Sequence, residues 1–285
     1  MIYSNTLCTL VGILLGWWLL RWQGRKAGLQ SIDVDVWLAL CIVAAYICVV
    51  IGMWLHGSAP FVLQWTRWLR PRGDVYVAFG ALALTTFLYA RVRRIPCGTM
   101  ANVGMPALLS FVVCARIGCF LHGCCWGDVC VDAVTLREQL DAATVARVCT
   151  LPWLCPSNWP LAVTFAPDTS AYMDQMLLGL LSPLQPRSLP CHPVQLYEAV
   201  LTAVLAGVLV WYQSRRPFPY SIACCGLGGY ALIRLLLEVL RADHAAVCCG
   251  LTEAQLISIG CLFVAIVWYM CAYKSAQRNH QKSAA

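Results

Sequence analysis

The stretch from Ala115 to Gly127, ARIGCFLHGCCWG, decides how the fold of this chain is interpreted. It places Arg116 at the end of a long apolar run that begins near residue 100. A charged side chain left unpaired in hydrocarbon costs about 2.5–3.5 kcal/mol or more. Arg116 is therefore expected either to extend from a helix end toward the lipid headgroups or to belong to a functional site within the membrane.

The composition around this stretch is that of a membrane protein. The chain is 60% hydrophobic and 12% charged, with a mean hydropathy of +0.70, whereas soluble domains are roughly 25% charged. Apolar runs that approach the ~20 residues of a spanning helix lie near residues 7–20, 36–55, 75–90, 100–121, 193–212, 220–240 and 252–273. They predict an all-α polytopic membrane protein with about seven transmembrane helices, or six if the short third run does not cross.

Basic residues predict the orientation of these helices. No basic residue precedes the first apolar run, so a cleaved signal peptide is not expected, and the N-terminus is predicted outside. The inner side then holds Arg21, Arg25, Lys26, Arg91, Arg93, Arg94, Arg215, Arg216, Lys274, Arg278 and Lys282, and the outer side holds Arg67, Arg70, Arg72, Arg137, Arg147, Arg187 and Arg241. This bias favours a cytoplasmic C-terminus. A basic rim suits anionic lipid headgroups, so the net charge of +7 requires no nucleic-acid partner.

The chain divides into four regions on this interpretation. Residues 1–127 hold four transmembrane helices, 128–191 form an outer segment, 192–273 hold three more helices, and 274–285 form a polar cytoplasmic tail without fixed structure. The outer segment is too short to form a large hydrophobic core by itself, so we expect it to cap the helix bundle. Helices are predicted within it near 133–147 and 173–181, and its cysteines (Cys130, Cys149, Cys155, Cys191) could form a disulfide in an oxidising compartment.

A polar stripe marks the sixth apolar run. Tyr230, Arg234, Glu238 and Arg241 are spaced by four, four and three residues, so they share one face of a helix. Exposing this face to lipid would be very unfavourable, so the stripe is predicted to face the interior or a hydrated cavity. Its arginine and glutamate could form a structural pair, or its guanidinium groups could bind an anionic headgroup, because their geometry matches phosphate.

The segment HPVQLYE, from His192 to Glu198, precedes the fifth run. Pro193 suits the first turn of a helix, so a helix is predicted to begin here at the membrane surface. The segment could serve as a capping and packing cluster or line the mouth of a cavity.

Cysteines and a histidine crowd the opening stretch. Cysteine and histidine are the usual zinc ligands, but Cys119, His122, Cys124, Cys125 and Cys130 lack a C-x-x-C spacing. We predict no metal here and interpret these residues as small groups that pack a tight turn. A redox or metal-handling protein built on the 18 cysteines is an alternative from another class.

Three segments in order, ARIGCFLHGCCWG, HPVQLYE and GYALIRLLLEVLRAD (Gly229 to Asp243), resemble those of the prolipoprotein diacylglyceryl transferases. The resemblance implies an enzyme of the bacterial inner membrane that needs no cofactor. Such an enzyme transfers the diacylglyceryl group of phosphatidylglycerol to the lipobox cysteine thiol of prolipoprotein signal peptides, the first step of lipoprotein maturation. The substrate supplies the nucleophile.

The resemblance also assigns roles to residues. Arg116 and Arg234 are expected to bind the donor and stabilise charge on its phosphate, with Tyr230, Glu238, Arg241, His192 and Gly127 as further substrate-binding residues. The chain departs from the family pattern at Tyr76, where a catalytic histidine is usual, and at Cys119 and Cys124, where asparagine and glutamate are usual.

These departures leave the general base open. Tyr76 is assigned to the catalytic set, although a tyrosine with a pKa near ~10 is a poor base. His122 or His192 could replace it, or the base could be dispensable. A member of the family that has lost catalysis and only binds anionic phospholipid is the remaining alternative.

Overall fold

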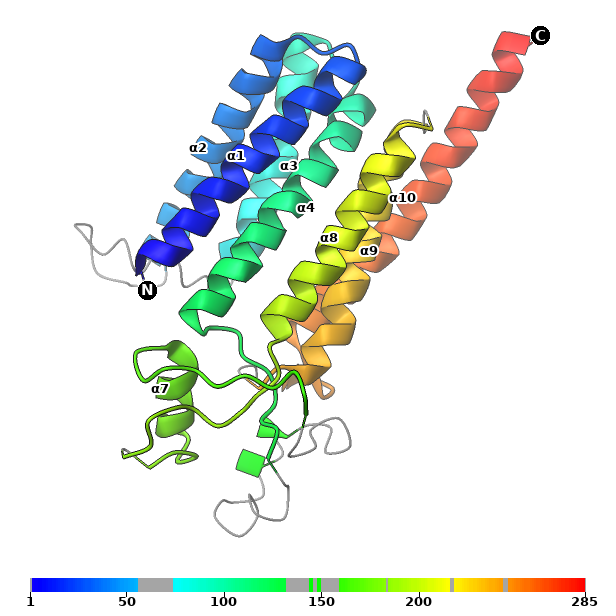
Figure 1. The fold of residues 1–285 in the computed structure, drawn as a ribbon. Coiled ribbons are helices and arrows are strands. Elements are labelled where there is room, and N and C mark those ends of the chain that lie inside the picture. Colours follow the sequence, from blue (N-terminus) through cyan, green and yellow to red (C-terminus); the bar gives the residue numbers. More distant parts are fainter. Residues whose placement is uncertain are drawn as a thin grey trace.

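A computed structural model describes residues 2–55, 74–131, 144–145, 148–149, 159–182, 184–215, 218–242 and 246–284. Long helices dominate the described chain (Figure 1). They are α1 (Ile2–Lys26), α2 (Ser31–Leu55), α3 (Asp74–Arg93), α4 (Cys97–His122), α8 (Val194–Gln213), α9 (Ser221–Leu237) and α10 (Glu253–Ala284). Shorter elements are α7 (Ser170–Leu177), the 3-10 turn η3 (Glu238–Leu240) and the antiparallel strands β1 (Ala246–Cys248) and β2 (Leu251–Thr252).

Five of the described helices are long and apolar enough to cross a membrane. They are α2, α4, α8, α9 with its η3 extension, and α10. The predicted all-α membrane architecture is therefore confirmed. Helix α1 packs on α4, and α3 packs on α2, but neither meets the same measure of length and hydropathy, so the count of seven transmembrane helices stays a prediction.

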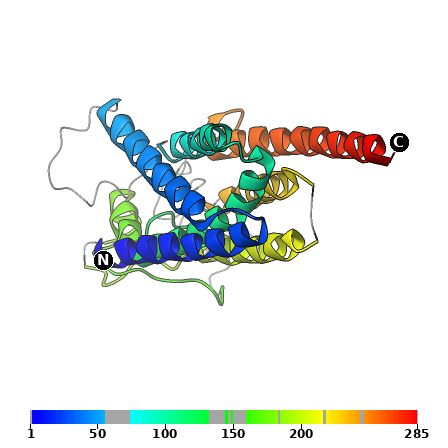
Figure 2. The same ribbon diagram turned by 90° about the horizontal axis from the view of Figure 1, so that it is seen from above.

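Helix α4 is the centre of the bundle (Figure 2). It packs against α1 on one side and against α8 and α9 on the other. Buried side chains from α1 to α4, such as Trp37 and Met100, fill the first interface. Leu109, Leu209 and Ile222 fill the second. The arginine at the end of α4 is thereby carried to the junction of α4, α8 and α9.

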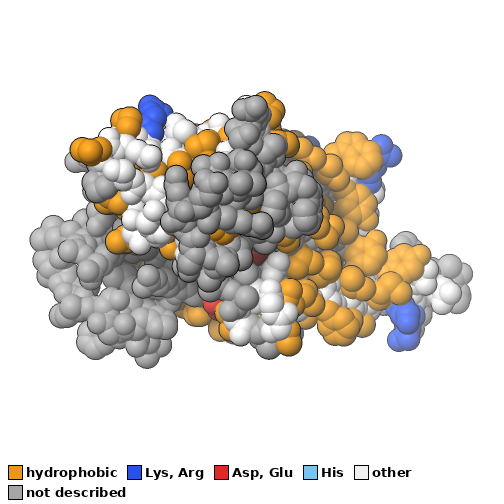
Figure 3. All heavy atoms as spheres, turned by 90° about the horizontal axis from the view of Figure 1, so that it is seen from below, with side chains coloured by type: hydrophobic (Ala, Val, Ile, Leu, Met, Phe, Trp, Pro, Cys, Tyr) orange, Lys and Arg blue, Asp and Glu red, His pale blue; other side chains and the backbone are white. Residues whose placement is uncertain are grey.

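Large apolar side chains cover the outer faces of the helices. Examples are Val204 and Val208 on α8, and Phe263, Ile266 and Met270 on α10, all of them exposed. Figure 3 shows hydrophobic side chains spread over much of the flank of the molecule that is drawn in colour. Apolar patches of this extent are rare on soluble monomers and are what lipid tails would cover.

The chain between α4 and α8 lies at one end of the bundle (Figure 1). A small core of its own includes Trp126, Val129 and Phe165 and extends to Ala242, which follows η3. Helix α7 begins at Ser170 because Thr169 accepts a hydrogen bond from the Tyr172 amide, three residues earlier than predicted. Most of the helix predicted near 133–147 lies outside the described residues, and the side of the membrane on which this segment lies stays a prediction.

The prediction of an unstructured tail after Lys274 was wrong. Helix α10 continues to Ala284, because the tail is built of good helix formers such as alanine, lysine, arginine and glutamine and has neither glycine nor proline. In the described outer segment, Cys130 and Cys191 are not joined in a disulfide, and Cys155 lies outside the described residues.

Candidate functional site

A sharp turn at the end of α4 builds one wall of the site. Gly123 adopts a left-handed conformation with φ 73° and donates to the carbonyls of Cys119 and Phe120, a helix ending that glycine favours. The amide of Cys124 also donates to Cys119, at 3.2 Å. The turn directs residues 124–128 beneath the bundle.

Gly127 joins this wall to two other segments. Its amide donates to the His192 carbonyl at 3.0 Å, and it forms a β-bridge with Arg241. A Cβ atom at this position would lie 2.5 Å from Val194 Cγ2 and 2.8 Å from the His192 carbonyl oxygen. Only glycine therefore allows the three segments to approach this closely.

Glu198 of α8 lies at the centre of the site. Its Oε1 is 2.9 Å from Arg116 Nε, and its Oε2 is 3.1 Å from Arg234 Nη1. The hydroxyl of Tyr230 donates to Oε1 at 2.8 Å. One carboxylate thus joins side chains from α4, α8 and α9.

A second carboxylate extends the cluster toward the outer segment. Glu238 Oε2 is 2.7 Å from Arg234 Nη2 and 3.9 Å from Arg241 Nε. Its other oxygen accepts a hydrogen bond from Thr252 Oγ1 at 3.1 Å. Arg234, Glu238 and Arg241 are all buried, so the stripe on α9 and η3 faces the interior.

Arginines outnumber glutamates among the side chains of these ion pairs. Arg116, Arg234 and Arg241 contribute a formal +3, and Glu198 and Glu238 contribute −2. The Arg116 side chain is 19% exposed and is turned to Glu198; this places it inside the bundle and not along a snorkelling path. A buried site that holds three guanidinium groups is suited to an anionic ligand.

Glu198 is the site residue that sequence reasoning missed. It was assigned to the HPVQLYE segment as part of the architecture around His192. The signal was present, because a carboxylate inside the apolar span of α8 needs a partner and the chain offers few arginines within its spans.

His192 lies in a neighbouring aromatic group. It is buried, its ring packs on Trp159, and its Nδ1 is 3.3 Å from the Tyr197 hydroxyl. This placement fits the packing interpretation of the segment. The backbone of Tyr76 lies in the first turn of α3, and its side chain lies outside the described residues.

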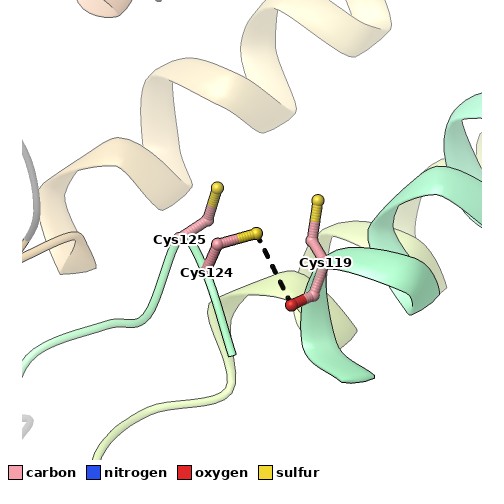
Figure 4. A group of neighbouring side chains, drawn as sticks. All are labelled: Cys119, Cys124 and Cys125. Atoms are coloured by element: carbon pink, nitrogen blue, oxygen red, sulfur yellow. Dashed lines mark hydrogen bonds between the residues drawn. The ribbon is translucent and has the colours of Figure 1, made fainter. Parts of the chain in front are cut away.

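Three cysteines lie together at the end of α4 (Figure 4), and one of them, Cys125, contacts Arg116. The sulfur atoms of Cys119, Cys124 and Cys125 all lie within 4.8 Å of one another. His122 and Cys130, grouped with them from the sequence, are not members of this trio. Hydrogen bonds from the Cys119 and Cys124 thiols, followed by the positive charges of Arg241 and Arg116, hold the pKa of Cys125 well below its usual value.

Fold and site together define an α-helical integral membrane protein with a cluster of arginine–glutamate ion pairs inside its helix bundle. The family profile described as prolipoprotein diacylglyceryl transferase matches residues 1–271. The chain belongs to this family.

Curated relatives are similar at low identity. A phosphatidylglycerol–prolipoprotein diacylglyceryl transferase of Clostridium tetani is 25% identical over 206 residues, covering 70% of this chain and 64% of the relative. The protein of the same name from Photorhabdus laumondii is 29% identical over 164 residues, covering 56% and 48%. That from Paraburkholderia phymatum is 25% identical over 215 residues, covering 72% and 64%. The chain thus spans less than two thirds of the length of each of these relatives.

Proposed function

We propose that this protein transfers the diacylglyceryl group of phosphatidylglycerol to the lipobox cysteine of prolipoproteins in the bacterial inner membrane. The family membership and the names of the relatives support the reaction class. The observation that carries the proposal is the pair of arginines, Arg116 and Arg234, held on the single carboxylate of Glu198.

The donor phosphate is bound by these guanidinium groups. Guanidinium forks bind phosphate oxygens in a bidentate manner, and the cluster brings three guanidinium groups to one end of the helix bundle. Tyr230, Glu238 and Arg241 act as positioning residues, because Tyr230 holds Glu198, Glu238 holds Arg234, and Arg241 pairs with Glu238. Gly127 and His192 shape the wall of the site.

The chemistry is a displacement at carbon. A bond forms between the thiolate sulfur of the precursor and the diacylglycerol carbon that carries the phosphate. The bond between that carbon and the phosphate oxygen breaks. The products are the thioether and glycerol phosphate, and the thiol proton leaves to a base. Negative charge grows on the departing phosphate, where preorganised guanidinium groups lower the barrier.

Complementation tests this proposal. The gene is expressed in a bacterium from which the resident transferase has been depleted, and lipidation of a reporter lipoprotein is measured by mass spectrometry. Wild-type protein should restore lipidation. Arg116→Lys and Arg234→Lys should each lower it by about 10²–10³-fold, the loss seen when one donor to a developing anion is removed, because lysine keeps the charge and loses the fork.

Arg93→Lys is the matched control. Arg93 pairs with Asp33, with 48% of its side chain exposed, and it ends α3, away from the Glu198 cluster. Lipidation by the control should stay at the wild-type level. Equal lipidation by all three lysine variants would contradict the headgroup site.

A second candidate is a family member that binds anionic phospholipid without catalysis. The cysteines at positions 119 and 124, in place of the usual asparagine and glutamate, favour it. A protein that binds phosphatidylglycerol through Arg116 and Arg234 and yet never lipidates a precursor would establish this candidate.

A further inference from the structure

Cys119, Cys124 and Cys125 are brought together by the turn that ends α4. Cys119 lies on the last turn of the helix, and Gly123 reverses the chain so that the Cys124 amide reaches the Cys119 carbonyl. Cys125 then adopts a left-handed conformation with φ 60°, which few side chains other than glycine and asparagine adopt readily. The local backbone thus brings the three thiol groups close together, with the Cys124 sulfur directed toward the Cys119 carbonyl (Figure 4).

The spacing of the sulfur atoms fits a metal ion. Zinc binds thiolates at about 2.3 Å, so three sulfurs around one ion lie about 4 Å apart. The three Sγ atoms lie within 4.8 Å of one another, so small rotations of the side chains would complete such a set. All three cysteines are partly exposed, which leaves a path for an ion.

The charge around the trio also suits thiolates. Arg116 Nη1 donates to Cys125 Sγ at 3.9 Å, and the same guanidinium is held by Glu198. Three thiolates and one divalent ion carry a net charge of −1, and the Arg116 guanidinium lies beside them.

We propose that Cys119, Cys124 and Cys125 bind one thiophilic divalent ion of the zinc type and that the fourth coordination position takes the thiol of the incoming precursor. The first step releases three protons as three thiols become ligands. The second releases one more, because a thiol that binds such an ion is deprotonated. The ion would thereby generate the nucleophile beside Arg116. This second step rests on the proposed function.

The proposal offers a reason for the departures of this chain from the family pattern. Where the usual histidine is replaced by Tyr76, a metal ion removes the need for a protein base. Where asparagine and glutamate are usual, Cys119 and Cys124 supply two of the three ligands.

Cadmium binding tests the site directly. Full-length protein, purified in detergent and reduced, is titrated with Cd²⁺, and the ultraviolet thiolate-to-cadmium charge-transfer band is recorded. We expect one tight equivalent for the wild type. We expect at least a tenfold weaker affinity for Cys119→Ser and for Cys125→Asn, which retains a residue suited to the left-handed backbone.

The vicinal pair Cys224 and Cys225 on α9 provides a matched control, since Cys224→Ser with Cys225→Ser removes two neighbouring thiols outside the trio. This variant should bind like the wild type. A measurement on wild-type protein avoids variants altogether: Cd²⁺ should protect the trio from iodoacetamide, as read by peptide mass spectrometry. Binding that survives in Cys119→Ser and Cys125→Asn, or an absence of protection, would overturn the site.

A lipobox peptide tests the fourth position. Its addition to the cadmium-loaded protein should strengthen the charge-transfer band, whereas a peptide with serine in place of the cysteine should not. Equal spectra with the two peptides would overturn thiol binding. Diacylglyceryl transfer is measured separately, in the complementation assay. A protein that binds cadmium at the trio but does not restore lipidation would refute the proposed function without refuting the metal site.

Discussion

Arg116 of α4 and Glu198 of α8 form an ion pair inside the bundle, with Arg116 Nε 2.9 Å from a carboxylate that is only 1% exposed. The other oxygen of this carboxylate holds Arg234. Two guanidinium groups from different helices are thereby fixed relative to each other before any ligand arrives. Such preorganisation is what makes charged groups effective at stabilising charge that develops during a reaction.

Glu198 should be needed for stability as well as for geometry. Replacing it by glutamine removes the shared counter-charge of Arg116 and of the buried Arg234. Removing one partner from a buried ion pair typically costs about 3–5 kcal/mol. We expect Glu198→Gln to lower the free energy of unfolding by about 3–5 kcal/mol. The measurement is the fall in the midpoint of thermal unfolding in detergent.

Glu253→Gln is the control for this substitution. Glu253 is exposed in the first turn of α10, so its loss should change the free energy of unfolding by no more than about 0.5 kcal/mol. Unfolding midpoints that fall equally in the two variants would refute the structural role of Glu198.

Gly127 should tolerate no side chain. In Gly127→Ala, the added methyl group meets Val194 and His192 at distances no packed atom adopts, so we expect a loss of about 1–3 kcal/mol, as for other overpacked positions. Gly207→Ala meets nothing within 4 Å and lies within α8, where alanine is favoured over glycine by about 0.5–1 kcal/mol. The two substitutions should therefore shift the unfolding midpoint in opposite directions. A stabilised Gly127→Ala protein would disprove the close approach.

The helices were predictable from sequence because hydropathy alone specifies where a chain can be buried in lipid. The predicted spans fall within the observed helices to within a few residues, as in α4 and α8. The helical tail after Lys274 could not be inferred in this way. Hydropathy identifies the part of α10 that can lie in lipid, but it does not report whether the polar residues that follow continue the helix.

The site was predictable only in part. The spacing of Tyr230, Arg234 and Glu238 identified an inward face from a single helix. Glu198 could not be paired with Arg116 from spacing, because the pair depends on how α4 packs against α8. The trio of cysteines depends in the same way on the reversal of the chain at Gly123.

The predicted topology can be checked with reporter fusions. The start of α1 and the chain between α4 and α8 lie at the same end of the bundle, and the end of α10 lies at the other (Figure 1). We expect a fusion after Lys274 to be active only in the cytoplasm and a fusion near residue 184 to be active only in the periplasm. A periplasmic signal after Lys274 would overturn the seven-helix topology.

Tyr76 separates two accounts of how the precursor thiol loses its proton. If its hydroxyl takes part in the chemistry, Tyr76→Phe should slow lipidation, and Tyr76→His should preserve or raise the rate, because the pKa of histidine suits a base near neutral pH. Initial rates in a membrane assay decide between these outcomes. Equal rates for wild-type, Phe and His proteins would show that Tyr76 carries no chemistry, as expected if the thiol is activated elsewhere.

Reconstitution of the purified protein in phosphatidylglycerol vesicles with a lipobox peptide tests the central claim most directly. The claim predicts that the peptide cysteine gains one diacylglyceryl group, that glycerol phosphate is released in equal amount, and that Arg116→Ala and Arg234→Ala abolish both. An unmodified peptide in the presence of wild-type protein that still binds the lipid through these arginines would contradict it.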